Sequence, residues 1–187
     1  MILMRHGQSQ FNVIYAETRE DPGIEDPALT PAGRQQAAEA GDRLASVGLR
    51  RIVTSPYRRT LHTAEIVAER LGLPVSVEPL IREHANFTCD IGTPASELRR
   101  LWPAFDFGDL PETWWPGLGE THDQVRARCE HFRQSAAVLA DWSHLLVVTH
   151  WGFIRGLTGH ELPNGATVRF DPVSADTSAV VSPARAC

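Results

Sequence analysis

Three short apolar runs, each followed directly by His or Arg, constrain the fold of this chain most strongly. The runs 2–4, 52–54 and 147–149 lead into Arg-His-Gly, Ser-Pro-Tyr-Arg-Arg and His-Trp-Gly. Runs of this length are typical of buried strands, and helix-like stretches separate them, which indicates an α/β protein with parallel strands. Ligands of open α/β sheets bind at the carboxyl ends of the strands. We therefore expect these His and Arg side chains to share one crevice.

The other predicted elements agree with this class. Strand-like runs cover 1–4, 52–54, 75–77 and 145–149. One helix begins after Thr30 as N-cap, with Pro31 at its first position, and ends at Gly48. Residues 58–71 and 121–142 are the other strong helix predictions. We expect an α/β fold, a three-layer helix-sheet-helix sandwich with a mostly parallel central sheet.

The length of 187 residues suits a single domain, 1–187. One segment, at about 83–119, departs from the regular pattern because its Pro, Gly and aromatic residues follow neither a helical nor a strand period. We expect an irregular insertion over the sheet edge, either a lid or specificity region or a loop fixed by its own aromatic residues. Trp114 and Trp115 would stack on a substrate ring or fill a small separate core.

The amino-acid composition limits the classes of ligand that we expect this protein to bind. The net charge of -5 argues against a nucleic acid, although a local Arg cluster can still bind a small anion. All 18 positive side chains are Arg, so no lysine is present for a Schiff base or a P-loop. No pair of histidines has the spacing of a metal site, and we expect neither a metal nor a cofactor.

Cysteine usage and hydropathy predict a cytoplasmic protein without a membrane partner. Cys89, Cys129 and Cys187 are odd in number and widely spaced, so we expect reduced thiols rather than disulfides or a zinc site. The chain begins without a signal sequence, and no apolar run approaches 18 residues. The sequence carries no signal for the oligomeric state.

The residues at the strand ends suit chemistry on a phosphate. Two Arg side chains can bind phosphate oxygens bidentately, and a helix beginning near Gly152 would add N–H donors. A neutral imidazole such as that of His6 can attack phosphorus when its other ring nitrogen is held by a hydrogen bond. Glu83 is the candidate general acid, which would then activate water for a second step. Asp90 and Glu97 are the alternatives for that role.

Four motifs carry a resemblance to a known family. They are RHGQSQFN (5–12), LTPAGRQQA (29–37), SPYRRTLHTA (55–64) and VTHWGFIR (148–155), with Glu120-Thr121 between the last two. In this order and spacing the chain resembles the histidine phosphatase superfamily, in its phosphoglycerate mutase-like branch, over nearly its whole length.

The resemblance implies a role for each matching position. His6 would carry the phosphoryl group, and Glu83 would donate the proton. The phosphate would be bound by Arg5, Asn12, Arg59 and His150. Arg59 rather than Arg58 occupies the family's position, and Arg58 is expected at the surface.

Three positions depart from the family's common pattern. Tyr57 stands where Leu is frequent, His62 where Gln is frequent, and Trp151 separates His150 from the Gly that commonly follows it. These departures bear on the shape of the pocket more than on its chemistry. We expect His84 and Trp151 as possible substrate contacts.

The resulting hypothesis is a phosphomonoesterase that hydrolyses a small phosphorylated metabolite through a phosphohistidine on His6. Neither Cys89 nor Cys129 has the downstream Arg of a cysteine phosphatase, and no D-x-D-x-T run is present. Two alternatives stay open. One is phosphoryl transfer of the phosphoglycerate mutase type, whose enzymes are usually longer, and the other is a module that binds a phosphorylated ligand without turnover.

Overall fold

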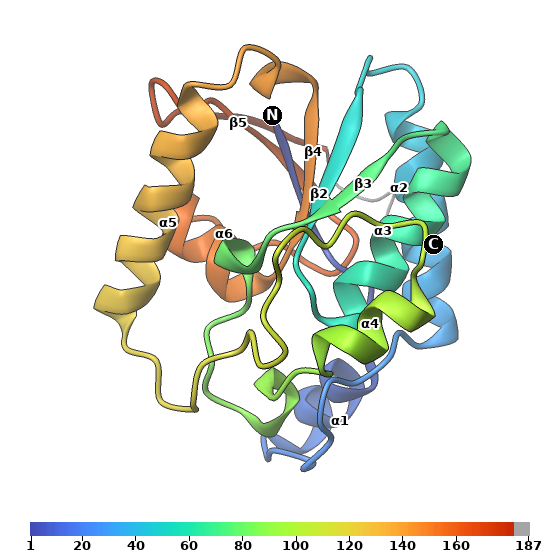
Figure 1. The fold of residues 1–187 in the computed structure, drawn as a ribbon, viewed down its shortest axis with the longest axis vertical. Helices are drawn as coiled ribbons and strands as arrows, with labels where there is room; N and C mark the ends of the chain where they lie inside the picture. Colours follow the sequence, from blue (N-terminus) through green and yellow to red (C-terminus); the bar gives the residue numbers. More distant parts are fainter. Residues whose placement is uncertain (182–187) are drawn as a thin grey trace.

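A six-stranded sheet forms the centre of the protein, in the order β3-β2-β4-β1-β5-β6 (Figure 1). This structure is a computed structural model, and it describes residues 1–181, so Cys187 lies outside the described residues. The strands are β1 (Ile2–Arg5), β2 (Arg51–Thr54), β3 (Val75–Val77), β4 (Leu145–Thr149), β5 (Thr167–Phe170) and β6 (Thr177–Val181). The first four are mutually parallel, whereas β5 and β6 pair antiparallel at one edge.

Helices cover both faces of this sheet. Figure 1 shows α2 (Pro31–Leu44) and α3 (Arg58–Leu71) on one face, and α5 (His122–Ala137) and α6 (Trp151–Thr158) on the other. Each interface buries its own apolar cluster, because parallel strands are apolar on both sides. The predicted three-layer sandwich with a mostly parallel sheet is thereby confirmed.

Two predicted helices are too long. The helix after Thr30 begins as expected, with the Thr30 hydroxyl accepting from Gly33 N at 3.0 Å, but it ends at Leu44 rather than Gly48. The predicted helix 121–142 ends at Ala137, and 142–144 form a separate 3₁₀ turn. Val138, the residue after the last helical turn, is apolar but exposed, so it forms no part of the core that would extend the helix.

Several elements had no prediction. The helix α1 (Gln10–Thr18) begins at a capping box in which Ser9 and Asn12 bond each other's backbone N–H. The helix α4 (Ala95–Leu101) and the two antiparallel strands were also missed. These are short elements whose formation depends on long-range packing more than on local periodicity.

The segment 83–119 builds its own small core. It contains the 3₁₀ turn Thr88–Asp90 and α4, and in Figure 1 it runs beside α1 beyond the carboxyl ends of the strands. Trp114 is buried against Tyr57, with ring centroids 4.6 Å apart, and its Nε1 donates to the Thr93 carbonyl at 2.9 Å. Trp114 therefore fills the separate core that was one of its two predicted roles.

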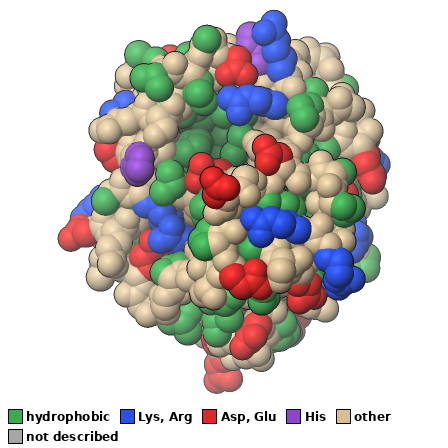
Figure 2. Space-filling model, in the orientation of Figure 1, with side chains coloured by type: hydrophobic (Ala, Val, Ile, Leu, Met, Phe, Trp, Pro, Cys, Tyr) green, Lys and Arg blue, Asp and Glu red, His purple; other side chains and the backbone are tan. Residues whose placement is uncertain are grey.

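Charge and hydropathy of the surface are unremarkable. Figure 2 shows basic and acidic side chains interspersed on this face, without a patch of one sign. Among residues 1–181 the longest apolar helices remain too short or too polar to cross a bilayer.

The loop that follows β1 lies in backbone contact with the first turn of α2. Gln8 N donates to Gln36 Oε1 at 2.8 Å, and Thr30 N donates to the Gln8 carbonyl at 2.9 Å. A Cβ atom added at Gly33 would overlap the Gln8 carbonyl, and one at Gly7 would overlap the Gly33 carbonyl. Both glycines are needed because neither backbone can move away without breaking these bonds.

This contact predicts an unusual response to alanine in a helix. Gly33→Ala should lower the free energy of unfolding by about 2 kcal/mol or more, since the new methyl group meets backbone atoms. The matched control Gly117→Ala, whose Cβ would meet nothing within 4 Å, should change it by less than about 1 kcal/mol. Urea unfolding measures both. A stabilised Gly33→Ala protein, as helix propensity alone would predict, would contradict the close packing.

Candidate active site

A cavity of about 460 Å³ opens where β1, β2 and β4 end. Its wall contains seven of the eight residues expected at the site and omits His150. The seven are Arg5, His6, Asn12, Arg59, Glu83, His84 and Trp151. Residues up to 146 positions apart in the chain, from Arg5 to Trp151, therefore meet at one sheet edge.

His6 is buried at the inner end of this cavity, and its tautomer is fixed. Its Nδ1 lies 2.7 Å from the carbonyl oxygen of Gly7. A carbonyl can only accept, so Nδ1 carries the proton and Nε2 keeps a lone pair. Burial, together with the charges of Arg59 and Arg5, holds the pKa of His6 well below its ordinary value. The imidazole is thus a neutral potential nucleophile.

Arg5 and Arg59 supply the positive charge. Arg59 donates to the Cys89 carbonyl at 2.8 Å and to Asp90 Oδ1 at 3.0 Å, and its guanidinium lies 4.3 Å from the Tyr57 ring centroid. Arg5 donates from one terminal nitrogen to the Leu162 carbonyl at 2.7 Å. Because each guanidinium has five N–H donors, both retain donors for an anion in the cavity.

His150 lies behind His6 rather than in the cavity wall. The two rings meet edge-on, with centroids 5.2 Å apart, and His150 Nε2 lies 2.9 Å from Ser55 Oγ. Its Nδ1 has no hydrogen-bond partner among residues 1–181. Burial and the charge of Arg59 lower the pKa of His150 well below its ordinary value. Its contact with phosphate stays a prediction.

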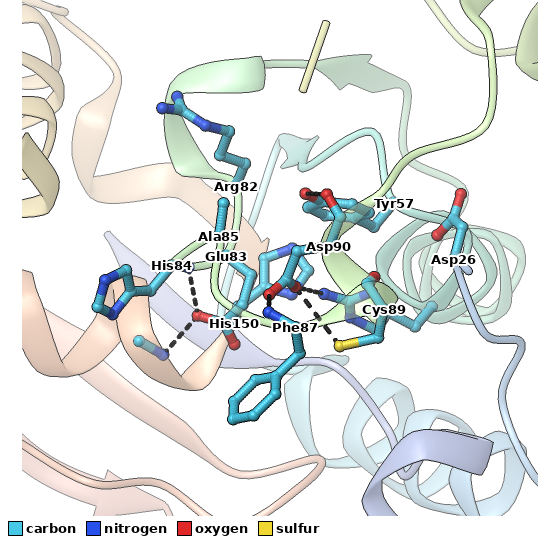
Figure 3. A network of polar contacts seen from close by, with 12 residues as sticks. Asp26, Tyr57, Arg82, Glu83, His84, Ala85, Phe87, Cys89, Asp90 and His150 are labelled. Carbon is cyan, nitrogen blue, oxygen red and sulfur yellow. Dashed lines mark hydrogen bonds and ion pairs between the residues drawn. The ribbon is translucent and has the colours of Figure 1, made fainter. Parts of the chain in front are cut away.

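The Glu83 carboxyl group is held by one of its two oxygens. Glu83 Oε1 accepts from His84 N at 2.9 Å and from Gly152 N at 2.8 Å, as the dashed lines in Figure 3 show. Any Cβ at position 152 would collide with this oxygen, so the close approach requires Gly152. Oε2 has no partner in the described part of the chain. Burial, and then the charge of Asp90, raises the pKa of Glu83, which favours the protonated acid.

A buried arginine fixes the main chain at Glu83 and at the residues that precede it. Arg128, on α5, donates to the carbonyls of Leu80 at 2.7 Å, Arg82 at 2.9 Å and Glu83 at 3.3 Å. Its other donors form a bidentate pair with Glu120, at 3.0 and 2.9 Å. Sequence reasoning assigned no role to Arg128, and the only signal was Glu120 within the family resemblance.

Asn12 and Asn164 form a second set of hydrogen bonds that supports the site, on the side of His6. Asn12 Oδ1 accepts from Ser9 N at 3.0 Å and from Asn164 Nδ2 at 3.1 Å, which leaves the Asn12 amide nitrogen as a donor at the cavity. Asn164 also donates to the His6 carbonyl at 3.1 Å. Asn164 lies in the segment between α6 and β5, and the sequence predicted no role for it.

The alternatives to Glu83 are placed differently. Asp90 lines the cavity, but it is occupied by the ion pair with Arg59 and by the backbone N–H groups of Asn86 and Phe87, each at 3.1 Å. Glu97 lies exposed on α4, 3.9 Å from Arg100 and outside the cavity wall. Glu83 is therefore the better placed candidate acid.

The outer part of the cavity contains residues that sequence reasoning missed. They are Phe11, Tyr15, Arg19, Asn86 and Phe87. The spacing of Phe11 and Tyr15 was the available signal, since residues four apart share one side of a helix. Within residues 1–181 no group of three or more His, Cys, Asp or Glu side chains is arranged to hold a metal, and Cys89 and Cys129 are free thiols.

Comparisons with known proteins give one matching family and solved structures of the same fold. A family model for the histidine phosphatase superfamily (branch 1) matches residues 1–181. A mycobacterial glucosyl-3-phosphoglycerate phosphatase, solved with VO3, superposes with a TM-score of 0.66 at 23% identity, covering 97% of this chain and 96% of that one. The corresponding values for Bacillus stearothermophilus YhfR are 0.63 and 28%, covering 97% and 94%.

Curated sequences match over a shorter region. The probable phosphoglycerate mutase GpmB of Salmonella arizonae is 38% identical over 81 residues, which is 43% of this chain and 36% of that protein. The match thus spans about a third of the length of this curated relative.

The lowered pKa values of the two histidines predict acid sensitivity of the fold. Below a pH of about 6.5 the unfolded chain takes up protons on these imidazoles while the folded protein does not. The free energy of unfolding therefore decreases as the pH is lowered. From pH 7 to pH 5 the loss should be about 2 kcal/mol for each histidine.

His150→Gln should therefore lose about 2 kcal/mol less than the wild type over this interval, as measured by urea unfolding at both pH values. The control His131→Gln, which removes an exposed histidine, should keep the wild-type dependence. Equal pH dependence in His150→Gln and the wild type would contradict a lowered pKa of His150 in the folded state.

Proposed function

The chain belongs to the histidine phosphatase superfamily, branch 1, and we propose that it is a phosphomonoesterase acting through a phosphohistidine on His6. One observation carries the proposal. The Nδ1–H of His6 is committed to the Gly7 carbonyl at 2.7 Å, inside a cavity that Arg5, Arg59 and Glu83 also line. A neutral nucleophile, an anion site and an acid are the three parts that phosphoryl transfer to histidine requires.

In the first step His6 Nε2 attacks phosphorus, and the bond from phosphorus to the alcohol oxygen breaks in line with the attack. Arg5 and Arg59 neutralise the charge on the non-bridging oxygens. The leaving oxygen takes a proton from the Glu83 carboxyl group, whose raised pKa favours the protonated form. The alcohol then departs and phosphohistidine remains.

In the second step the Glu83 carboxylate accepts a proton from water, and that water attacks the phosphorus. The bond from phosphorus to Nε2 breaks, which returns His6 to its neutral form and releases phosphate. Glu83 recovers its proton, so the cycle closes without another cofactor. We propose that the free Nδ1 of His150 and the amide of Asn12 contact the phosphate during both steps.

A mutase is the second candidate, because 43% of this chain matches GpmB, which is named a probable phosphoglycerate mutase. Supplying 3-phosphoglycerate with its bisphosphate primer separates the two reactions. We expect phosphate release to exceed formation of 2-phosphoglycerate, and the reverse would favour the mutase. A protein that bound phosphate but released none from a panel of monoesters would instead be a binding module.

The roles of His6 and Glu83 predict different losses of catalytic activity when each residue is replaced. His6→Ala should lower kcat for p-nitrophenyl phosphate to background. Glu83→Gln should lower kcat/KM, which reports the steps up to departure of the alcohol, about 10²- to 10⁴-fold for an alkyl phosphate. The loss of kcat/KM should be smaller for p-nitrophenyl phosphate, whose leaving group needs little protonation. Steady-state phosphate release measures both, and Glu97→Gln is the matched control with wild-type rates. Full activity of His6→Ala would refute the mechanism, and equal losses for both substrates in Glu83→Gln would remove the acid role.

A further inference from the structure

Three aromatic rings form one side of the cavity beyond the phosphate-binding residues, and we call Phe11, Tyr15 and Phe87 the aromatic wall. Phe11 and Tyr15 come from neighbouring turns of α1, and Phe87 comes from the loop after Glu83. Their ring centroids are 5.2 Å apart for Phe11 and Tyr15, 5.4 Å for Phe11 and Phe87, and 5.2 Å for Tyr15 and Phe87. Three rings in mutual contact thus present a continuous apolar surface to the cavity.

The polar groups beside this wall are few. Apart from the residues of the phosphate-binding end, the polar side chains that line the cavity are those of Ser9, Arg19, His84 and Asn86. Both lining carboxylates belong to the inner end, where Glu83 is the candidate acid and Asp90 pairs with Arg59. The Arg19 guanidinium lies 5.8 Å from the Tyr15 ring centroid, at cation-π distance. A sugar would leave its hydroxyl groups largely unpaired against the faces and edges of these rings.

The aromatic wall is fixed relative to the phosphate-binding end. One oxygen of Asp90 accepts from Arg59 at 3.0 Å, and the other accepts from the backbone N–H of Phe87 at 3.1 Å (Figure 3). On the far side of Phe87, Thr88 N donates to Asp21 Oδ2 at 2.7 Å. A single carboxylate therefore sets the position of Phe87 and of the guanidinium that would hold the phosphate.

We propose that the aromatic wall binds the alcohol portion of the substrate, and that this portion carries a planar apolar ring. The inference rests on the proposed phosphatase function, because it places the phosphate at His6. The cavity of about 460 Å³ lies within the size range of sites for drug-sized ligands, so it extends well beyond a phosphate group. Ring faces favour planar apolar groups through contact area and aromatic stacking.

Benzyl phosphate and glycerol 1-phosphate test this assignment, because both release a primary alcohol and differ mainly in the group that meets the wall. The ratio of their kcat/KM values should favour benzyl phosphate by about tenfold or more in the wild type. Phe87→Ala and Tyr15→Ala should each lower that ratio about tenfold. Phe87→Leu should lower it less, since leucine restores apolar area without a planar face.

Trp115→Ala is the matched control. Trp115 is a half-buried aromatic residue of the same 83–119 segment, and it lies outside the cavity wall. Its replacement should leave the ratio at the wild-type value. Thermal unfolding of each variant identifies any that fails to fold, and Tyr15→Ala, on a different element, decides the question if Phe87→Ala does not fold.

Measurements of ligand binding test this inference independently of the proposed function. If neither ester is hydrolysed, the phosphatase proposal fails, and calorimetry with benzylphosphonate and methylphosphonate then tests the wall alone. Tighter binding of benzylphosphonate that is lost in Phe87→Ala and Tyr15→Ala would support the wall. A wild-type preference for glycerol 1-phosphate, ratios unchanged in both alanine variants, or equal affinities for the two phosphonates would overturn it.

Discussion

The buried ion pair between Arg59 and Asp90 connects the phosphate end of the site to the aromatic wall. Its two side chains are 3% and 0% exposed, so removal of either partner would leave a charge buried without compensation, at a cost of about 3–5 kcal/mol. Arg59 faces the phosphate end of the cavity, whereas Asp90 holds the backbone of Asn86 and Phe87. Tyr57 supports both partners, since its ring lies under the guanidinium and its hydroxyl donates to the Asp90 carbonyl at 2.7 Å. The residue that departs from the family's frequent Leu therefore serves this ion pair.

Burial also shifts the pKa values of an imidazole and a carboxyl group in opposite directions, each towards the neutral form. In water Glu loses its proton near pH 4.3 and His near pH 6.5, so a neutral imidazole and a protonated carboxyl group rarely coexist. Here burial and the two arginines lower the pKa of His6, while burial and Asp90 raise the pKa of Glu83. The proposed first step needs both neutral forms together. One poorly hydrated pocket favours the nucleophile and the acid through the same physical cause.

The sequence was sufficient for the four parallel strands and for the inner end of the cavity, because strand ends followed by His and Arg fix where the side chains emerge. Residues whose positions depend on distant partners could not be predicted. Arg128 reaches the carbonyl of Leu80, 48 positions away, and Asn164 reaches that of His6, 158 positions away. His150 emerges at the predicted sheet edge, but its ring packs against that of His6 and does not line the cavity, since a strand end determines the edge but not the depth of a side chain.

The most direct test of the account is to identify the phosphorylated residue. Glu83→Gln protein mixed with p-nitrophenyl phosphate and quenched in alkali should retain the intermediate, because loss of the base slows attack by water. Peptide mass spectrometry should then place phosphate on His6, on a bond that survives alkali and is lost in acid. Phosphate on another residue, or product formation with His6 unmodified at every time point, would contradict the account.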